Sequence, residues 1–223
     1  MKRASLLLLL VCAACSRLPD FAAPKRIDSG SAEGRESDDL ISYRKLARGD
    51  FKRKSAPGQV KHGKYELGAL TCGSISTSPD TQLELVTTKD PDGTVTYTGT
   101  LKVLRFRSLM DRQCSWWNPT NKQHDYTLQH EQIHFALHEI EARRLNQKAA
   151  QLVKTTKIEA DDKDAVVERL NTLIKELLDE HIEIALERNH DFDSETSLGH
   201  DPKRQAEWWN TVQRELAETE RFK

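Results

Sequence analysis

The stretch TLQHEQIHFALHEIEARRL, residues 127–145, decides the fold. Residues spaced three and four apart along it share one face of an α-helix, and Leu137 and Leu145 lie on one such face. We therefore expect a long helix that begins near Asp125 or Thr127, either of which could cap it, and that runs to about Lys157. Its inward stripe consists of His130, His134, Leu137, Glu141, Leu145 and Leu152.

Two further helices are expected downstream. Asp161, Asp162 and Asp164 would place negative charge on the first turn of the second helix, where the helix dipole favours it. This helix should end near Asn189, and a third should run from about Pro202 to Phe222. The buried stripe of the second helix is expected to be Val166, Leu170, Leu173, Ile174, Leu177, Leu178, Ile182 and Ala185.

Upstream of residue 106 the spacing of the apolar residues changes from the helical pattern to an alternation at every second residue, which is typical of a β-strand. Residues 95–103 alternate apolar and polar side chains, residues 83–88 form a second β-prone run, and KDPDG at 89–93 has strong turn chemistry. We expect a hairpin within a small antiparallel sheet. The fold class is thus α+β: a small antiparallel sheet, then a long antiparallel helical hairpin and a C-terminal helix.

The first helix carries an HExxH motif, residues 130–134. Histidines at i and i+4 lie on one helix face, so His130 and His134 can share one Zn²⁺ ion. Zinc lowers the pKa of a water molecule to about 7, and Glu131 is predicted to act as the general base that takes its proton. His138 lies about 12 Å along the axis from His130, too far to share the ion.

A third ligand must come from elsewhere. If the two long helices pair antiparallel and turn near residue 160, His134 is level with about residue 186 and His130 with about residue 190. The third ligand is therefore sought among Glu187, His190, Asp191, Asp193, Glu195 and His200. Carboxylate oxygen and imidazole nitrogen are both acceptable to zinc, so ligand chemistry leaves the choice within this segment open.

Several other polar and aromatic residues invite a role. His181 lies deep in the stripe of the second helix, so we expect it to pair with the inward Glu141, while Glu183 projects to solvent. Tyr126 precedes the motif and could donate to an oxyanion. Paired tryptophans usually pack in cores, although they could also line a cleft; the pairs are Trp116–Trp117 and Trp208–Trp209.

The N-terminus resembles a bacterial lipoprotein leader. Lys2 and Arg3 precede an apolar run at 6–11, and two alanines stand directly before Cys15. We expect a signal peptide over 1–14, lipidation of Cys15, a flexible linker over 15–40 and one domain over 41–223. The protein would be anchored in the cell envelope, facing the periplasm from the outer membrane. An ordinary signal peptide cleaved near Ala14 would instead release a periplasmic or secreted protein.

Cysteine content and charge add two expectations. If Cys15 is lipidated, Cys72 and Cys114 are the two cysteines left in the domain, and an oxidising compartment favours a disulfide between them over two buried thiols. Without the leader's two cations, 32 of the 34 basic residues remain against 35 acidic ones. This balance gives no electrostatic argument for nucleic acid as a partner.

These motifs together resemble a bacterial family of secreted zinc-dependent proteases catalogued as domain of unknown function 922. That family has HEQ-x-HF, matched at 130–135 and preceded by Ser115-Trp116, and then approximately YD-x-ET-x-HG and a Gln-Ala-x-Trp-rich helix. Residues 192–200 read FDSETSLGH, and 205–209 read QAEWW. Asp193 keeps its family position, but Leu198 stands where the family histidine falls, and His200 follows two positions later. The resemblance therefore implies Asp193 and His200 as equal candidates for the third ligand, with Glu187 behind them.

The resemblance implies a zinc metalloprotease whose partner is a peptide or protein substrate. The residues therefore predict an exported zinc metalloprotease acting at the cell envelope, with Glu131 catalytic and His130, His134, Asp193 and His200 as the candidate metal ligands. Two alternatives stay open. One is a zinc-binding envelope lipoprotein without catalysis, and the other is a zinc-dependent hydrolase of cell-wall amide bonds.

Overall fold

The computed structural model describes residues 39–56, 58, 61–62 and 65–223. The signal peptide over 1–14, the lipidated Cys15 and nearly all of the linker over 15–40 lie outside this part of the chain. The described part combines small antiparallel sheets with three helices, so the predicted α+β class is confirmed. Within it, no helix combines the length and the apolar content that a membrane span requires.

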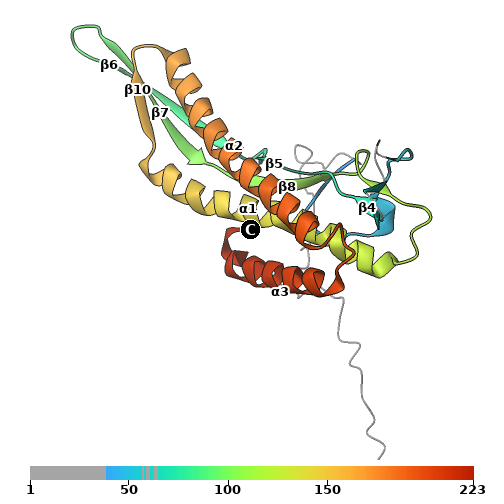
Figure 1. The fold of residues 1–223 in the computed structure, drawn as a ribbon. Coiled ribbons are helices and arrows are strands. Elements are labelled where there is room, and N and C mark those ends of the chain that lie inside the picture. The colour runs from blue at the N-terminus through green and yellow to red at the C-terminus, as the bar shows by residue number, and fades with distance from the viewer. Residues whose placement is uncertain (1–38, 57, 59–60, 63–64) are drawn as a thin grey trace, which may run out of the picture.

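Helix α1 (His124–Thr155) lies between α2 (Lys163–Glu195) and α3 (Pro202–Glu218), and contacts both (Figure 1). Its start differs from the prediction. The N-cap is Gln123, which makes no side-chain capping bond, and Thr127 lies inside the first turn. There the Thr127 hydroxyl accepts a hydrogen bond of 2.8 Å from the Asn121 amide, so this side chain braces the preceding loop instead of capping the helix.

Helix α2 begins as expected and ends later. The Asp162 side chain caps it by accepting from the Asp164 amide at 2.8 Å. The helix continues to Glu195 rather than ending near Asn189, because its last turns carry an apolar side chain that packs in the core. Phe192 is fully buried there and packs on Trp208 of α3 with ring centroids 5.5 Å apart. Asp193 therefore projects from a helix and not from a loop.

The two long helices are joined by a short strand that the sequence analysis missed. Strand β10 (Lys157–Ala160) pairs antiparallel with β7 (Val95–Val103), and β7 pairs with β6 (Gln82–Lys89) in the predicted hairpin. Helix α2 crosses this sheet at Gly99, where an added Cβ would meet Val166 and Leu170. In Figure 1 the three strands extend with the first half of α2 as an arm.

The remaining strands lie toward the other end of α1. One sheet has the order β1-β8-β5, and β2-β3 and β4-β9 form two-stranded sheets. The predicted disulfide is confirmed, since Cys72 is bonded to Cys114 and so ties the β4–β5 segment to the loop before β9. The strands of these sheets are β1 Leu40–Ser42, β2 Lys61–His62, β3 Tyr65–Glu66, β4 Ala69–Leu70, β5 Gly73–Thr77, β8 Phe106–Asp111 and β9 Trp116–Trp117. Two 3-10 turns lie at Arg48–Asp50 and Glu220–Phe222.

Two apolar clusters hold these layers on α1. One contains Ile133, Leu137 and Ile140 under β8 and α3, and the other contains Leu145 and Ala149 under β7 and α2. All four tryptophans belong to packed regions: Trp116 and Trp117 are buried, and Trp208 and Trp209 pack against the first cluster. None of them lines the cleft described below, which favours the packing interpretation.

Candidate metal centre

Three side chains from the two long helices converge at one point. His134 Nε2 lies 3.1 Å from His130 Nε2. Asp193 Oδ1 lies 3.2 Å from His130 Nε2 and 3.1 Å from His134 Nε2. The helical spacing of i and i+4 aligns the two rings, and the antiparallel partner helix supplies the carboxylate. A group of two imidazoles and a carboxylate this close could bind a metal ion. We call it the His–His–Asp group.

Each histidine is held from behind by an amide side chain. His134 Nδ1 lies 2.6 Å from Asn189 Oδ1, one turn before Asp193 on α2. His130 Nδ1 lies 3.1 Å from Oε1 of Gln205, which is fully buried on α3. Phe192 adds an apolar wall by stacking on the His130 ring, with centroids 4.4 Å apart. All three helices therefore contribute to the orientation of the two imidazoles.

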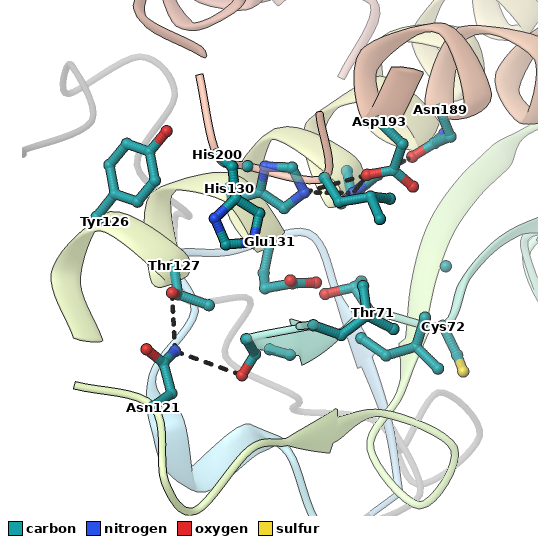
Figure 2. A pocket seen from close by; sticks show the side chains of 18 of the residues that line it. Thr71, Cys72, Asn121, Tyr126, Thr127, His130, Glu131, Asn189, Asp193 and His200 are labelled. Carbon is teal, nitrogen blue, oxygen red and sulfur yellow. Dashed lines mark hydrogen bonds and ion pairs between the residues drawn. The ribbon is translucent and has the colours of Figure 1, made fainter. Parts of the chain in front are cut away.

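Glu131 lies beside the His–His–Asp group with an unused carboxylate oxygen. It is 2 % exposed, and within the described part of the chain its Oε2 has no hydrogen-bond partner. Thr71 Oγ1, on the opposite wall, also lacks one, and Figure 2 shows the two side chains pointing toward one another. Both line a cleft of about 560 Å³ that also contains the His–His–Asp group. A buried carboxylate oxygen without a partner carries a desolvation cost that a ligand in the cleft could relieve.

The charges in the group are strongly coupled. Burial opposes a charged His134, but Asp193, Glu131 and the bond to Asn189 together raise its pKa to about 9. Burial likewise opposes ionisation of Asp193, yet the charge of His134 and hydrogen bonds from both histidines hold the pKa of this carboxyl well below its usual range. A metal ion that binds here must therefore displace a proton from His134.

The structure brings Asp193, and not His200, into the His–His–Asp group. His200 is exposed at the rim of the same cleft, with Nε2 3.3 Å from the Glu66 carbonyl oxygen. Glu187 is exposed on α2 and does not line the cleft. His138 is buried, and its Nδ1 donates to the His134 carbonyl oxygen at 3.0 Å. It is therefore a neighbour of the site that bonds to the backbone of its own helix.

The loop that follows α2 is pressed against the site in an unusual conformation. Ser197 and Leu198 have φ of 51° and 56°, and Gly199 has φ of 77°. Non-glycine residues seldom adopt this region, and strain of this kind concentrates at functional sites. A Cβ on Gly199 would lie 3.1 Å from His130 Nδ1, so only glycine allows the loop to approach this ring without displacing it. Leu198 also lines the cleft.

Sequence reasoning did not assign roles to Asn189, Gln205 or Thr71. Asn189 stood at the expected end of α2, and Gln205 was noted only as part of a motif. Amides and hydroxyls have no spacing signature comparable to HExxH, since their function depends on which element packs opposite them. Tyr126 does line the cleft, and within the described residues its hydroxyl has no hydrogen-bond partner.

Comparison of the chain with models of known protein families, with curated proteins and with solved structures found no match. The resemblance to domain of unknown function 922 therefore remains a prediction from the sequence motifs.

Proposed function

We propose that this protein is an exported zinc metallopeptidase in which His130, His134 and Asp193 hold the ion and Glu131 is the general base. One observation carries the proposal. Three ligand atoms lie within 4.8 Å of one another in a cleft where the neighbouring Glu131 carboxylate oxygen is buried and has no partner among the described residues. Catalytic zinc sites use three protein ligands and leave one position for water or substrate.

The donor set fits zinc. Two imidazole nitrogens and one carboxylate oxygen suit this borderline-soft ion, and the same set also holds non-haem iron(II). Glu131 favours zinc, because a buried base beside the ion serves hydrolysis. Zinc held there would polarise a substrate carbonyl and lower the pKa of a water molecule to about 7.

The chain's own residues would then perform the proton transfers. Glu131 accepts the proton of the attacking water and delivers it to the leaving amine of the substrate. Its burial at 2 % exposure excludes bulk water, and Asp193 would offset one of the two positive charges of a zinc ion held there. Thr71, whose buried Oγ1 has no partner in the described part of the chain, lines the opposite wall of the cleft.

A peptide is the substrate that this cleft and the HExxH chemistry favour. The cleft opens to solvent between the β4–β5 segment and α2, and apolar residues such as Leu70, Leu186 and Leu198 line it. The lipoprotein-type leader places the enzyme at the bacterial cell envelope, anchored through Cys15 and facing the periplasm. The resemblance to the secreted zinc-protease family supports the same activity.

Metal content and cleavage test the proposal together. Zinc and iron are measured in the purified full-length protein beside His134→Ala, and casein cleavage is measured with Glu131→Gln as the control. About one zinc per chain, lost with His134 and accompanied by cleavage that needs Glu131, is the expected result. Zinc without cleavage would favour a non-catalytic zinc lipoprotein, and release of cell-wall peptides would favour an amide hydrolase. Absence of zinc from the wild-type protein would refute the proposal.

A further inference from the structure

The orientation of the Asn189 amide is fixed by the backbone of its own helix. Its Nδ2 donates to the Ala185 carbonyl oxygen at 2.6 Å, and a carbonyl oxygen can only accept. Its Oδ1 must therefore be the atom that faces His134 Nδ1 at 2.6 Å. An amide oxygen also only accepts, so Nδ1 of His134 is required to carry a proton.

The same logic holds for Gln205, through a different helix. Its Nε2 donates to the Tyr126 carbonyl oxygen at 3.1 Å and to Gln129 Oε1 at 3.0 Å. Its Oε1 therefore faces His130 Nδ1 at 3.1 Å and accepts from it. Gln205 is fully buried on α3, so water does not compete for these bonds. Two backbone carbonyls thus determine which nitrogen of each histidine is a donor.

We infer that Asn189 and Gln205 are positioning residues, which keep a proton on Nδ1 of His134 and His130 and thereby direct each Nε2 lone pair to the metal. The inference rests on the proposed function and adds to it two residues that never touch the ion. Metal-bound histidines commonly donate their second ring N–H to an oxygen, which fixes both the tautomer and the ring plane.

The geometry explains why both residues are needed. The two Nε2 atoms and Asp193 Oδ1 meet at 3.1–3.2 Å, and this convergence is lost if either ring rotates about its Cβ–Cγ bond. Asn189 reaches the group from α2, which also carries Asp193, whereas Gln205 reaches it from α3. The docking of α3 on α1 thereby becomes part of the metal site.

Leucine variants remove the acceptor oxygen and the donor of each amide; leucine has as many non-hydrogen side-chain atoms as asparagine and one fewer than glutamine. Asn189→Leu and Gln205→Leu are each expected to weaken zinc binding about 10- to 100-fold, measured on the full-length protein by competition with a chromophoric chelator. Asn171→Leu on α2 and Asn210→Leu on α3 replace exposed residues of the same helices and should leave affinity unchanged.

A spectroscopic readout separates positioning from folding and from metal binding. In the metal-free protein the hydrogen-bonded Nδ1 protons of both histidines should give resolved downfield NMR signals. Each leucine variant should lose the signal of its own histidine and keep the other. Retention of both signals, or zinc affinity equal to that of the wild type, would overturn the inference. If the wild type binds no zinc, the proposed function fails, and the proton signals alone then decide whether the amides hold the rings.

Discussion

His181 Nδ1 lies 3.0 Å from Glu141 Oε2 and joins the middle of α2 to the middle of α1. The sequence predicted this pair, and the structure confirms it. The other oxygen of Glu141 accepts from Arg144 at 2.5 Å and from Arg188 at 3.1 Å, so one buried carboxylate holds three partners. Burial raises the pKa of Glu141, but the bond from His181 and the two arginine charges outweigh it, and the pKa is lowered.

This network predicts a pH-dependent loss of stability in Glu141→Gln. Breaking a buried ion pair by removing one partner costs about 3 kcal/mol, which urea unfolding at pH 7 should detect. Because the folded-state pKa of Glu141 is depressed, the contribution of the carboxylate is present above the unfolded pKa of 4.5. It should disappear as the pH falls through the folded value. Glu183→Gln, exposed on α2, is the control, and a gap that persists in acid would contradict the prediction.

Substitution of Asp193 should identify the third metal ligand. Asp193→Asn removes the anionic oxygen at nearly constant shape and is expected to weaken zinc binding by more than about 100-fold, since loss of a ligand should exceed loss of an outer partner. His200→Ala should bind zinc as the wild type does, because this side chain lies outside the His–His–Asp group. Asp191→Asn, exposed two residues away, controls for charge. Loss of metal from the His200 variant instead would reassign the ligand.

Zinc should stabilise the folded protein, since the group is assembled from helices that separate on unfolding. With free zinc at 100 times its dissociation constant, the gain is about 2.7 kcal/mol. For a domain of this size the melting temperature then rises by about 5–10 °C. Calorimetry with and without chelator measures the effect, which should be absent from His134→Ala. Magnesium prefers oxygen ligands and should not reproduce it.

Gly199 and Gly93 form a matched pair for the role of the loop after α2. Both have positive φ, 77° and 91°, so replacement by alanine should cost each about 1 kcal/mol through backbone strain. Only at Gly199 would the new Cβ meet a site residue, 3.1 Å from His130 Nδ1, whereas Gly93 has open space. Gly199→Ala should therefore also weaken zinc binding. Equal zinc affinity in the two variants would show that the loop does not constrain the histidine.

The features that were predicted correctly from the sequence depend on the spacing of histidines and apolar residues along the chain. The interval between His130 and His134 determines that both rings share a face, and the inward stripe of α1 placed Glu141 opposite His181. Antiparallel pairing of the helices then directed the search to the segment that holds Asp193. The alternation in residues 95–103 predicted β7 and its hairpin with β6.

The errors have a common physical origin, which is that tertiary packing decides short elements. Strand β10 has four residues and is defined by pairing with β7, not by an intrinsic pattern. The side chain of His134 meets Asn189, three residues beyond the expected position 186. The last turns of α2 look polar, and only the burial of Phe192 beneath α3 explains why the helix continues. The same dependence on α3 hid the role of Gln205.

The strand between the helices makes chain length a determinant of the chemistry. One helical turn is 5.4 Å, so sliding α2 along α1 by a turn would present Asn189 where Asp193 now meets the histidines. The pairing of β10 with β7 prevents this shift, because its register determines where α2 begins relative to the sheet that packs on α1. Natural variation should therefore lengthen or shorten the exposed 90–93 turn freely, while deletions and insertions between residues 156 and 162 should be eliminated by selection.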